Sequence, residues 1–302
     1  MIRGKLLAFL SPILVLAGAL SVSTMLSEGR ASEQDNKEAV LIGAGDIADC
    51  TDLSGAEATA KLLEANPGTV MALGDLAYPD GTAENFKCYD KTWGRVKDRT
   101  RPAVGNHEFH SSGATYYFKY FGAAAGDPKT GYYSYDLGTW HVVVLNSECK
   151  EVGGCEAGSP QEKWLRADLT AHPVGCTLAY FHKPRFSSGL NHGNDEEVTP
   201  LWQALYDFNA EIIVNGHEHD YERFAPQDPN GKADPKRGIR EFVVGTGGKN
   251  HREFGFHKPN SELRNNDTFG VLKLTLKQLG YEWKFLPEAG KTFTDSGSGS
   301  CH

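Results

Sequence analysis

The sequence of 302 residues has no dense block of lysine and arginine. Its 31 basic and 39 acidic residues give a formal net charge of −8 at pH 7. A general nucleic-acid-binding protein needs a basic surface, so this composition argues against that class and predicts no nucleic-acid partner. An acidic protein that handles an anionic substrate needs locally bound cations, and metal ions would supply them.

The sequence also lacks a Cys-x-x-Cys pair, so a thiolate zinc site is not expected. It has no internal repeats, and its one low-complexity stretch is the Gly/Ser-rich tail at residues 296–300. Hydrophobic residues make up 39% and charged residues 23%, which are ordinary values for a globular chain. A chain of this length can bury a full core as one large α/β domain or two small ones.

Beyond the N-terminus, no segment approaches the length of a transmembrane helix. Arg3 and Lys5 precede a nearly uncharged apolar stretch at residues 6–20, an order typical of a secretory signal peptide. We place this signal at residues 1–31 and a single catalytic domain at residues 38–302. The alternative is an uncleaved signal anchor, but the stretch is short for a bilayer span. We therefore expect a secreted protein, extracellular or periplasmic, with no stable membrane span after cleavage.

Six cysteines form an even set in a chain with an export signal, which favours three disulfides. Six cysteines allow many pairings. The pairs that we prefer are Cys50 with Cys88, Cys149 with Cys155, and Cys176 with Cys301. The first bond would tie together the loops that follow two candidate metal ligands, and the last would fix the C-terminal tail.

Five short apolar runs each end at a residue that can bind a metal ion. The residues at these ends are Asp46, Asp75, Asn106, His182 and His217, with His219 two positions after the last. A single aspartate after a strand is commonly a turn residue. In open α/β sheets, however, ligands bind outside the carboxyl ends of the strands. Five such runs at one sheet edge therefore predict a metal cluster better than five unrelated turns.

The segment between the first two runs predicts how they are arranged. A capping box at residues 54–57 opens a helix that runs to about residue 65, and a strand lies on either side of it. Two strands joined by a helix form a βαβ unit, so they should be parallel. Asp46 and Asp75 would then lie at the same sheet edge.

The rest of the chain predicts an α/β fold. Helical patterns cover residues 83–100, the segment that begins at residues 159–162, and residues 199–208. Residues 132–145 and 270–286 alternate like hairpins. Strands before and after the helices suggest two sheets stacked together, with helices outside.

The donor atoms indicate which metals fit. Hard oxygen donors mixed with imidazoles, without thiolates, suit Fe, Mn or Zn. Two cations about 3.5–4 Å apart form the arrangement that carries out in-line displacement at phosphorus. Asp75 is the candidate bridging ligand because it begins the densest motif, and Tyr78 follows it by three residues. Tyr78 is either a further ligand or a packed aromatic residue.

Taken together, the motifs resemble those of the calcineurin-like metallophosphoesterases. The segments that carry the resemblance are Asp46, residues 74–78, residues 105–108, His182 and residues 216–219. The tyrosine three residues after the second aspartate resembles the purple acid phosphatase branch, as does the Gly-His-Glu-His-Asp-Tyr-Glu-Arg run at residues 216–223. The resemblance extends from about residue 40 to residue 221 and implies a four-layer α/β/β/α sandwich of two mixed sheets flanked by helices.

The resemblance divides the metal ligands into two groups that share Asp75 as a bridge. The ligands of the first ion, ferric iron in the family, would be Asp46, Tyr78 and His219. The ligands of the second ion, a divalent Zn, Mn or Fe, would be Asn106, His182 and His217.

Two further histidines would act on the substrate. The resemblance implies that His107 contacts the phosphate and that His192 protonates the leaving group, because an alkoxide leaves poorly unless it is protonated. The residues around His192 match the family only loosely. Glu108 and Glu218 are expected to support the ligands rather than to bind metal.

Two other departures from the family pattern are visible. The first motif, at residues 45–50, reads Gly-Asp-Ile-Ala-Asp-Cys instead of Gly-Asp-x-Gly. After the expected signal, the chain is also too short for the additional N-terminal β-domain of the plant enzymes, so we expect a short form.

The implied function is that of a metal-dependent phosphoric ester hydrolase of the acid phosphatase type. It would hydrolyse small phosphate monoesters by attack of a metal-bound hydroxide. A phosphodiesterase or nucleotide hydrolase with the same centre is the alternative. A non-catalytic metal- or phosphate-binding protein is a remote alternative, which predicts lost ligands, whereas none is lost here.

Overall fold

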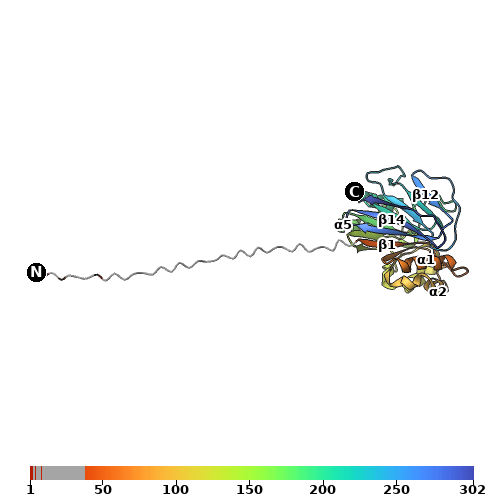
Figure 1. Ribbon diagram of the computed structural model, residues 1–302, viewed down its shortest axis with the longest axis horizontal. Coiled ribbons are helices and arrows are strands. Elements are labelled where there is room, and N and C mark those ends of the chain that lie inside the picture. The colour runs from red at the N-terminus through yellow and green to blue at the C-terminus, as the bar shows by residue number, and fades with distance from the viewer. Residues whose placement is uncertain (3, 5–7, 9–37) are drawn as a thin grey trace. The chain divides into compact units, whose positions relative to one another are not determined.

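The computed structural model describes residues 1, 2, 4, 8 and 38–302 (Figure 1). The chain divides into two units, Met1–Asn36 and Lys37–His302. The signal peptide that the sequence predicts at residues 1–31 lies almost entirely outside the described residues. Within the described residues, no helix has the length and apolar character needed to cross a membrane.

The second unit contains two large mixed sheets. The strands of the six-stranded sheet are, in spatial order, β15 (Ser296–Ser300), β14 (Gly280–Pro287), β13 (Gly270–Lys277), β1 (Ala39–Ala44), β3 (Thr69–Leu73) and β5 (Thr100–Ala103). Those of the seven-stranded sheet are β12 (Ser261–Asn265), β10 (Tyr221–Phe224), β11 (Arg240–Val244), β9 (Ile212–Asn215), β8 (Thr177–Tyr180), β7 (Trp140–Val144) and β6 (Tyr133–Leu137). A small pair joins β2 (Ala48–Asp49) to β4 (Ala77–Tyr78).

Helices lie on the outer faces of the sheets. They are α1 (Ser54–Ala65), α2 (Ala83–Lys91), α3 (Asn106–Phe109), α4 (Thr115–Phe121), α5 (Pro160–Ala171) and α6 (Thr199–Asp207). Short 3₁₀ segments are η1 (Trp93–Arg99), η2 (Ser112–Ala114), η3 (Gly122–Ala125) and η4 (Cys149–Val152). In Figure 1, α1 and α2 are seen together at the lower right of the domain, and α5 is seen at its left edge.

The alternation of side chains along the strands separates two cores. In β7, Val142 and Val144 pack into the core between the sheets, whereas Val143 packs with α5 and α6. In β9, Ile212 and Ile213 divide in the same way. Successive side chains of a strand point to opposite faces, so a strand buried on both faces reads as one apolar run. The predicted stacking of two mixed sheets with helices outside is confirmed.

Two local predictions about helices are wrong. Ser54 does not cap α1 with its side chain; Asp52 Oδ1 instead accepts the N–H of Ser54 at 2.9 Å, just before the helix. The helix expected over residues 83–100 ends at Lys91, because Thr92 leaves the helical region (φ −113°, ψ −93°). This break lets Trp93 turn inward, where its indole N–H donates to Thr59 Oγ1 at 2.9 Å.

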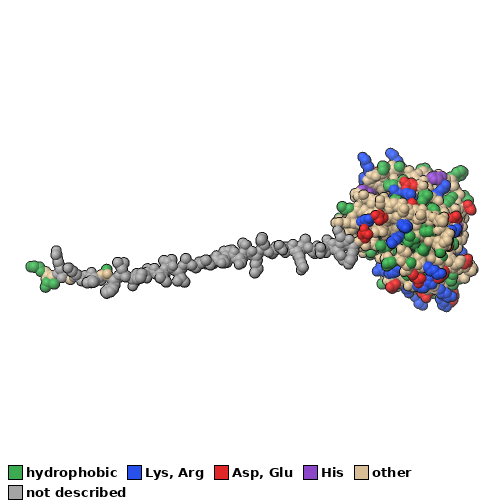
Figure 2. Space-filling model, viewed as in Figure 1, with side chains coloured by type: hydrophobic (Ala, Val, Ile, Leu, Met, Phe, Trp, Pro, Cys, Tyr) green, Lys and Arg blue, Asp and Glu red, His purple; other side chains and the backbone are tan. Residues whose placement is uncertain are grey.

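The three disulfides that we preferred are all present: Cys50–Cys88, Cys149–Cys155 and Cys176–Cys301. The Gly/Ser-rich tail is ordered as β15, which pairs antiparallel with β14. Its Gly297 is needed there, because an added Cβ would lie 2.3 Å from the Trp283 ring. On the face of this domain shown in Figure 2, basic side chains are interspersed with acidic ones.

Candidate metal centre

Parallel strands of both large sheets bring the candidate ligands together. Asp46, Asp75 and Asn106 follow β1, β3 and β5 of the six-stranded sheet, whereas His182 and His217 follow β8 and β9 of the seven-stranded sheet, so the expectation of one sheet edge is wrong. β1 pairs parallel with β3, β3 with β5, and β8 with β9. The residues that follow these strands turn sharply: Asp46, Asp75 and His217 have φ values of 61°, 52° and 73°. Residues other than glycine seldom adopt this left-handed backbone conformation, and those that do are commonly found at functional sites.

Glycines allow these loops to approach each other closely. Gly74 has φ +82°, and an added Cβ would lie 2.6 Å from Nδ1 of His182. An added Cβ on Gly105 would lie 2.3 Å from Oδ1 of Asp75. Gly74, just before Asp75, therefore leaves room for His182, and Gly105, just before Asn106, leaves room for Asp75.

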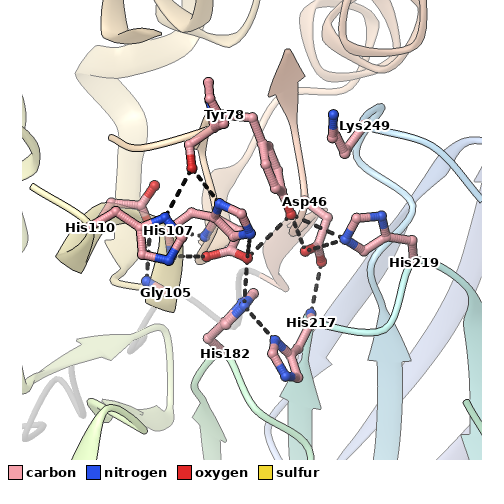
Figure 3. Close-up of polar contacts among 12 residues, drawn as sticks. Asp46, Tyr78, Gly105, His107, His110, His182, His217, His219 and Lys249 are labelled. Atoms are coloured by element: carbon pink, nitrogen blue, oxygen red, sulfur yellow. Dashed lines mark hydrogen bonds and ion pairs between the residues drawn. The ribbon is translucent and has the colours of Figure 1, made fainter. Parts of the chain in front are cut away.

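The first group of donors is formed by Asp46, Tyr78 and His219, which converge in Figure 3. The hydroxyl of Tyr78 donates to Asp46 Oδ1 at 2.8 Å and lies 3.1 Å from His219 Nε2. His219 Nε2 lies 3.2 Å from the same Asp46 oxygen. All three side chains are buried. The expected ligands of the first ion thus point their donor atoms at one place.

Of the second expected ligand group, His182 and His217 lie in direct contact. Nε2 of His182 lies 3.1 Å from Nδ1 of His217 (Figure 3). Asn106 begins α3, and its buried side-chain oxygen has no hydrogen-bond partner among the described residues. A buried amide oxygen without a partner is costly. A cation at this place would remove that cost.

Asp75 lies between the two groups. Its Oδ2 is 3.1 Å from His182 Nε2 and accepts the Tyr78 hydroxyl at 3.2 Å. Its other oxygen accepts the backbone N–H of His107 at 2.8 Å. One carboxylate therefore contacts a donor of each group, which is the position of a bridging ligand.

The far sides of two imidazoles are anchored. Nδ1 of His182 contacts the carbonyl oxygen of Leu73 at 2.8 Å, and Nδ1 of His219 contacts Oδ1 of Asn250 at 2.6 Å. When Nδ1–H donates to such an acceptor, Nε2 keeps its lone pair for a metal ion. Both rings are thus held in the orientation that ligation requires, and loss of any proton on Nε2 would leave the tautomer that binds a metal ion.

The two glutamates beside these ligands support loops, as expected. Glu108 accepts the N–H groups of Asp75 and Gly105, each at 2.9 Å. Glu218 accepts those of His192 and Gly193, each at 2.7 Å. In these four bonds the carboxylates accept only backbone N–H groups, so both glutamates hold the backbone of the loops that carry the candidate site residues.

Without a cation, protons hold the buried carboxylates and imidazoles together. Burial opposes a charge on His182, but the adjacent Asp75 carboxylate outweighs this and raises the pKa of His182 to about 10. Burial raises the pKa of Tyr78 well above its usual value, and the charges of Asp46 and Asp75 raise it further. Tyr78 therefore stays a phenol here, and only a strongly charged cation would displace its proton.

The two histidines expected to act on substrate both lie beside the centre. Nε2 of His107 is 3.8 Å from Asp75 Oδ2, and its ring lies against Tyr78 with centroids 4.3 Å apart. The ring of His192 stacks on His217 at 4.0 Å and is 40% exposed. His192 is more exposed than His107, so His192 is the histidine at the rim of the site.

Sequence reasoning missed the residues after β11. Arg252 donates to His192 Nδ1 at 3.1 Å and to the carbonyl oxygen of His217 at 3.3 Å. Lys249 lies over the Tyr78 ring at 5.1 Å from its centroid, and pairs with Asp49. A signal was present: β11 is an apolar strand that ends in a glycine-rich turn, as the other runs do, and it pairs parallel with β9.

The site fits two metal ions by the chemistry of its donors. Asp46, Asp75, Tyr78, His182 and His219 bring buried carboxylate, phenol and imidazole atoms together, and the buried oxygen of Asn106 has no hydrogen-bond donor among the described residues. Asp75, His182 and His217 also have ligand atoms within 4.8 Å of one another. Oxygen and imidazole donors together suit Fe, Mn and Zn.

Comparison with known proteins agrees with this geometry. A family model described as calcineurin-like phosphoesterase matches residues 22–221. Purple acid phosphatase 21 of Arabidopsis thaliana is 31% identical over 235 residues, which cover 70% of this chain and 52% of the relative. Another relative in that plant, named probable inactive purple acid phosphatase 1, is 27% identical over 248 residues, or 68% of this chain and 38% of the relative. The chain thus spans about half the length of these curated relatives, or less.

The fold is also found in a solved structure. A purple acid phosphatase isolated from yellow lupin (Lupinus luteus) seeds superposes with a TM-score of 0.74 at 18% identity, covering 88% of this chain and 54% of that chain. The match by the family model, the relatives and the shared fold agree with the ligand geometry. The chain therefore belongs to the calcineurin-like phosphoesterase family, on its purple acid phosphatase-like branch.

Proposed function

We propose that this protein is a secreted phosphatase with a binuclear metal centre that hydrolyses small phosphate monoesters. The observation that carries the proposal is the position of Asp75, whose carboxylate contacts His182 of one donor group and Tyr78 of the other. A carboxylate shared by two donor groups fits two neighbouring cations, the arrangement that serves displacement at phosphorus.

We propose ferric iron beside Tyr78 and a divalent Zn, Mn or Fe ion beside Asn106. The first group contains two anionic oxygen donors, Asp46 and the phenol, which favour a trivalent ion once the phenol proton is lost. The second group offers a neutral amide and two imidazoles, which suit a divalent ion. Bound ions of this kind supply Lewis acidity and neutralise the charge of a phosphate ester.

The remaining residues would bind and orient the substrate. His107 and Arg252 present nitrogen atoms beside the two donor groups, and both would contact phosphate oxygens. His192 lies at the rim, where a leaving group would emerge, and would give a proton to the departing oxygen. Arg252 donates to Nδ1 of His192, so the ring in this structure is the neutral form with its proton on Nε2. To act as the acid, His192 would first take up a proton on Nδ1, with the bond to Arg252 opened, and then give the Nε2 proton to the leaving group.

Secretion is part of the proposal. Three disulfides join all six cysteines, and such bonds persist in oxidising compartments. We assign residues 1–31 as the signal peptide and residues 38–302 as the single catalytic domain. Detection of the processed protein outside the cytoplasm, with an N-terminus near residue 32 by mass spectrometry, would test this assignment.

A paired measurement of metal content and activity tests the function. The wild type should contain two metal ions per chain that depend on Asp75, and should hydrolyse an aryl monoester faster than the matching diester. Asp75→Asn keeps the volume of the side chain but removes the charge, so metal content and rate should fall together, the rate by several orders of magnitude. A variant with both metals and near-normal turnover would refute the bridging role.

The same substrates separate the alternatives. A higher kcat/KM for the diester, or for a nucleotide, would replace the monoesterase assignment by a phosphodiesterase or nucleotide hydrolase. A protein that binds metal but hydrolyses none of these substrates would be a non-catalytic member. One relative's name, probable inactive purple acid phosphatase 1, makes this control necessary.

A further inference from the structure

A second cluster of metal-binding side chains lies away from the centre described above. It is formed by His141 near the start of β7 and by Asp168 and His172 at the C-terminal end of α5. Their ligand atoms lie within 4.8 Å of one another. β7 pairs parallel with β8, and His182 follows the far end of β8. The cluster therefore lies at the opposite edge of the sheet from the candidate centre.

His141 is held as a metal ligand would be. Its side chain is buried, with Nδ1 2.8 Å from Asp136 Oδ1 and Nε2 2.8 Å from Asp168 Oδ2. If Nδ1–H donates to Asp136, Nε2 keeps a lone pair directed at the place beside Asp168. A carboxylate that orients the far nitrogen of a ligating histidine is the usual partner in zinc sites.

Asp168 and His172 complete the set from the helix. They are four residues apart, so they lie on one face of α5. Ser134 Oγ donates to Asp168 Oδ1 at 2.8 Å and fixes the carboxylate. His172 Nδ1 lies 2.8 Å from the backbone carbonyl oxygen of Asp168 and 3.5 Å from Oδ1, so Nε2 is the nitrogen of His172 that is left for a metal ion. The rings of His141 and His172 stack with centroids 4.3 Å apart and an interplanar angle of 12°. Because the ring planes are parallel, their in-plane lone pairs do not converge as they stand. The half-exposed His172 would turn about its side-chain bonds to direct Nε2 at an ion beside His141.

We propose that His141, Asp168 and His172 form a peripheral site for one Zn²⁺ ion. Two imidazoles and one carboxylate are zinc ligands, and an alkaline-earth ion would prefer more oxygen atoms. His172 is 40% exposed, which gives the ion a path of entry and leaves room for a water molecule as a fourth ligand. The bound ion would tie α5 to the β6–β7 hairpin, whose strand β6 is at the edge of its sheet.

Protons compete with zinc for this site. A proton on His141 would let both of its nitrogens donate to carboxylates, so the ion must displace that proton. The charged or titratable groups that face His141 are Asp136 on β6 and Asp168 and His172 on α5. Zinc binding should therefore weaken by tenfold or more as the pH falls from 8 to 6.

The test is to measure how many zinc ions the whole protein retains per chain, with its binuclear centre left in place. After equilibrium dialysis against ZnCl₂ at pH 8, the wild type should retain one more zinc ion per chain than His172→Ala. His257→Ala, which replaces an exposed histidine outside the cluster, should retain as many as the wild type. Because the binuclear centre is the same in all three proteins, its occupancy cancels in the difference, and hydrolysis by His172→Ala should be unchanged. This result does not depend on the proposed phosphatase activity.

A stability measurement gives a second readout. Added ZnCl₂ should raise the thermal midpoint of the wild type by several degrees more than that of His172→Ala or Asp168→Asn, since a ligand that binds only the folded state stabilises it. Equal zinc counts and equal shifts in the wild type and both variants would overturn the site. The cluster would then be an ion-pair network held by protons alone.

Discussion

The carboxylate of Glu108 accepts a hydrogen bond from the backbone N–H of Asp75 at 2.9 Å. It also accepts the N–H groups of Leu76, Ala77 and Gly105, at 2.8, 3.3 and 2.9 Å. One side chain from α3 thus fixes both the loop that carries Asp75 and the loop that carries Asn106. Glu108 thus positions the Asp75 carboxylate through the backbone of its loop.

Replacement of Glu108 by alanine should therefore damage both the fold and the centre. It would leave four buried N–H groups without acceptors, at about 1–3 kcal/mol each. We expect the free energy of unfolding to fall by about 3 kcal/mol or more, and metal content to fall with it. Denaturant unfolding and elemental analysis measure the two effects. Glu84→Ala, at an exposed position, is the control; wild-type values for Glu108→Ala would disprove the positioning role.

Tyr78 should determine the colour of the protein. A phenolate bound to ferric iron absorbs visible light by charge transfer, so the pure protein should be pink to violet. Tyr78→Phe should bleach it while circular dichroism shows the fold intact, and activity should fall only in part. Tyr89→Phe, another buried tyrosine, should keep the colour. Colourless, fully active wild-type protein without iron would refute the ferric assignment and leave two divalent ions.

His192 should matter most when the leaving group is poor. If it protonates the departing oxygen, His192→Ala should slow alkyl phosphate hydrolysis by about 100-fold or more, and slow aryl phosphates with good leaving groups much less. Rates for a series of leaving groups measure the difference. Equal losses across the series would show that His192 positions substrate or packs on His217 instead.

The Cys50–Cys88 bond should stabilise the loops beside the centre. It spans 38 residues, for which loop-closure entropy gives about 4 kcal/mol, whereas the 6-residue span of Cys149–Cys155 gives about 2 kcal/mol. Replacing both cysteines of each pair by alanine avoids free thiols. Urea unfolding should show the larger loss for the Cys50/Cys88 variant, with a loss of metal. A smaller loss than for Cys149/Cys155 would contradict this account.

The His141 cluster should make stability depend on pH when no zinc is added. Burial opposes a charge on His141, but its bonds to Asp168 and Asp136 outweigh this and raise its pKa. Because the folded-state pKa lies above the unfolded one, the stabilisation is complete below about pH 6.5. It is lost as the pH rises through the folded-state pKa. Asp168→Asn should flatten this part of the pH profile of unfolding; identical profiles would exclude the contribution.

The sequence by itself determined the strands that deliver the ligands and the residues at their ends. The alternation of apolar residues and the turns after them are local, so Asp46, Asp75 and His217 could be placed at strand ends, and the βαβ pattern placed Asp46 and Asp75 at the same sheet edge. The sequence did not reveal that His217 comes from the second sheet. The Cys50–Cys88 pair was likewise linked to the loops after Asp46 and Asp75, and the Cys176–Cys301 pair to the Gly/Ser-rich tail. Local pattern was enough because strand period and turn chemistry act over a few residues.

Only the tertiary structure decided the features that join distant segments. The break at Thr92 arises because Trp93 reaches Thr59 on another helix, and a helical pattern alone does not reveal it. Arg252 enters the centre because β11 lies beside β9, and His141 meets His172 because β7 packs under α5. In each case the deciding energy comes from burial and hydrogen bonds between residues far apart in the chain, which overrides local propensity.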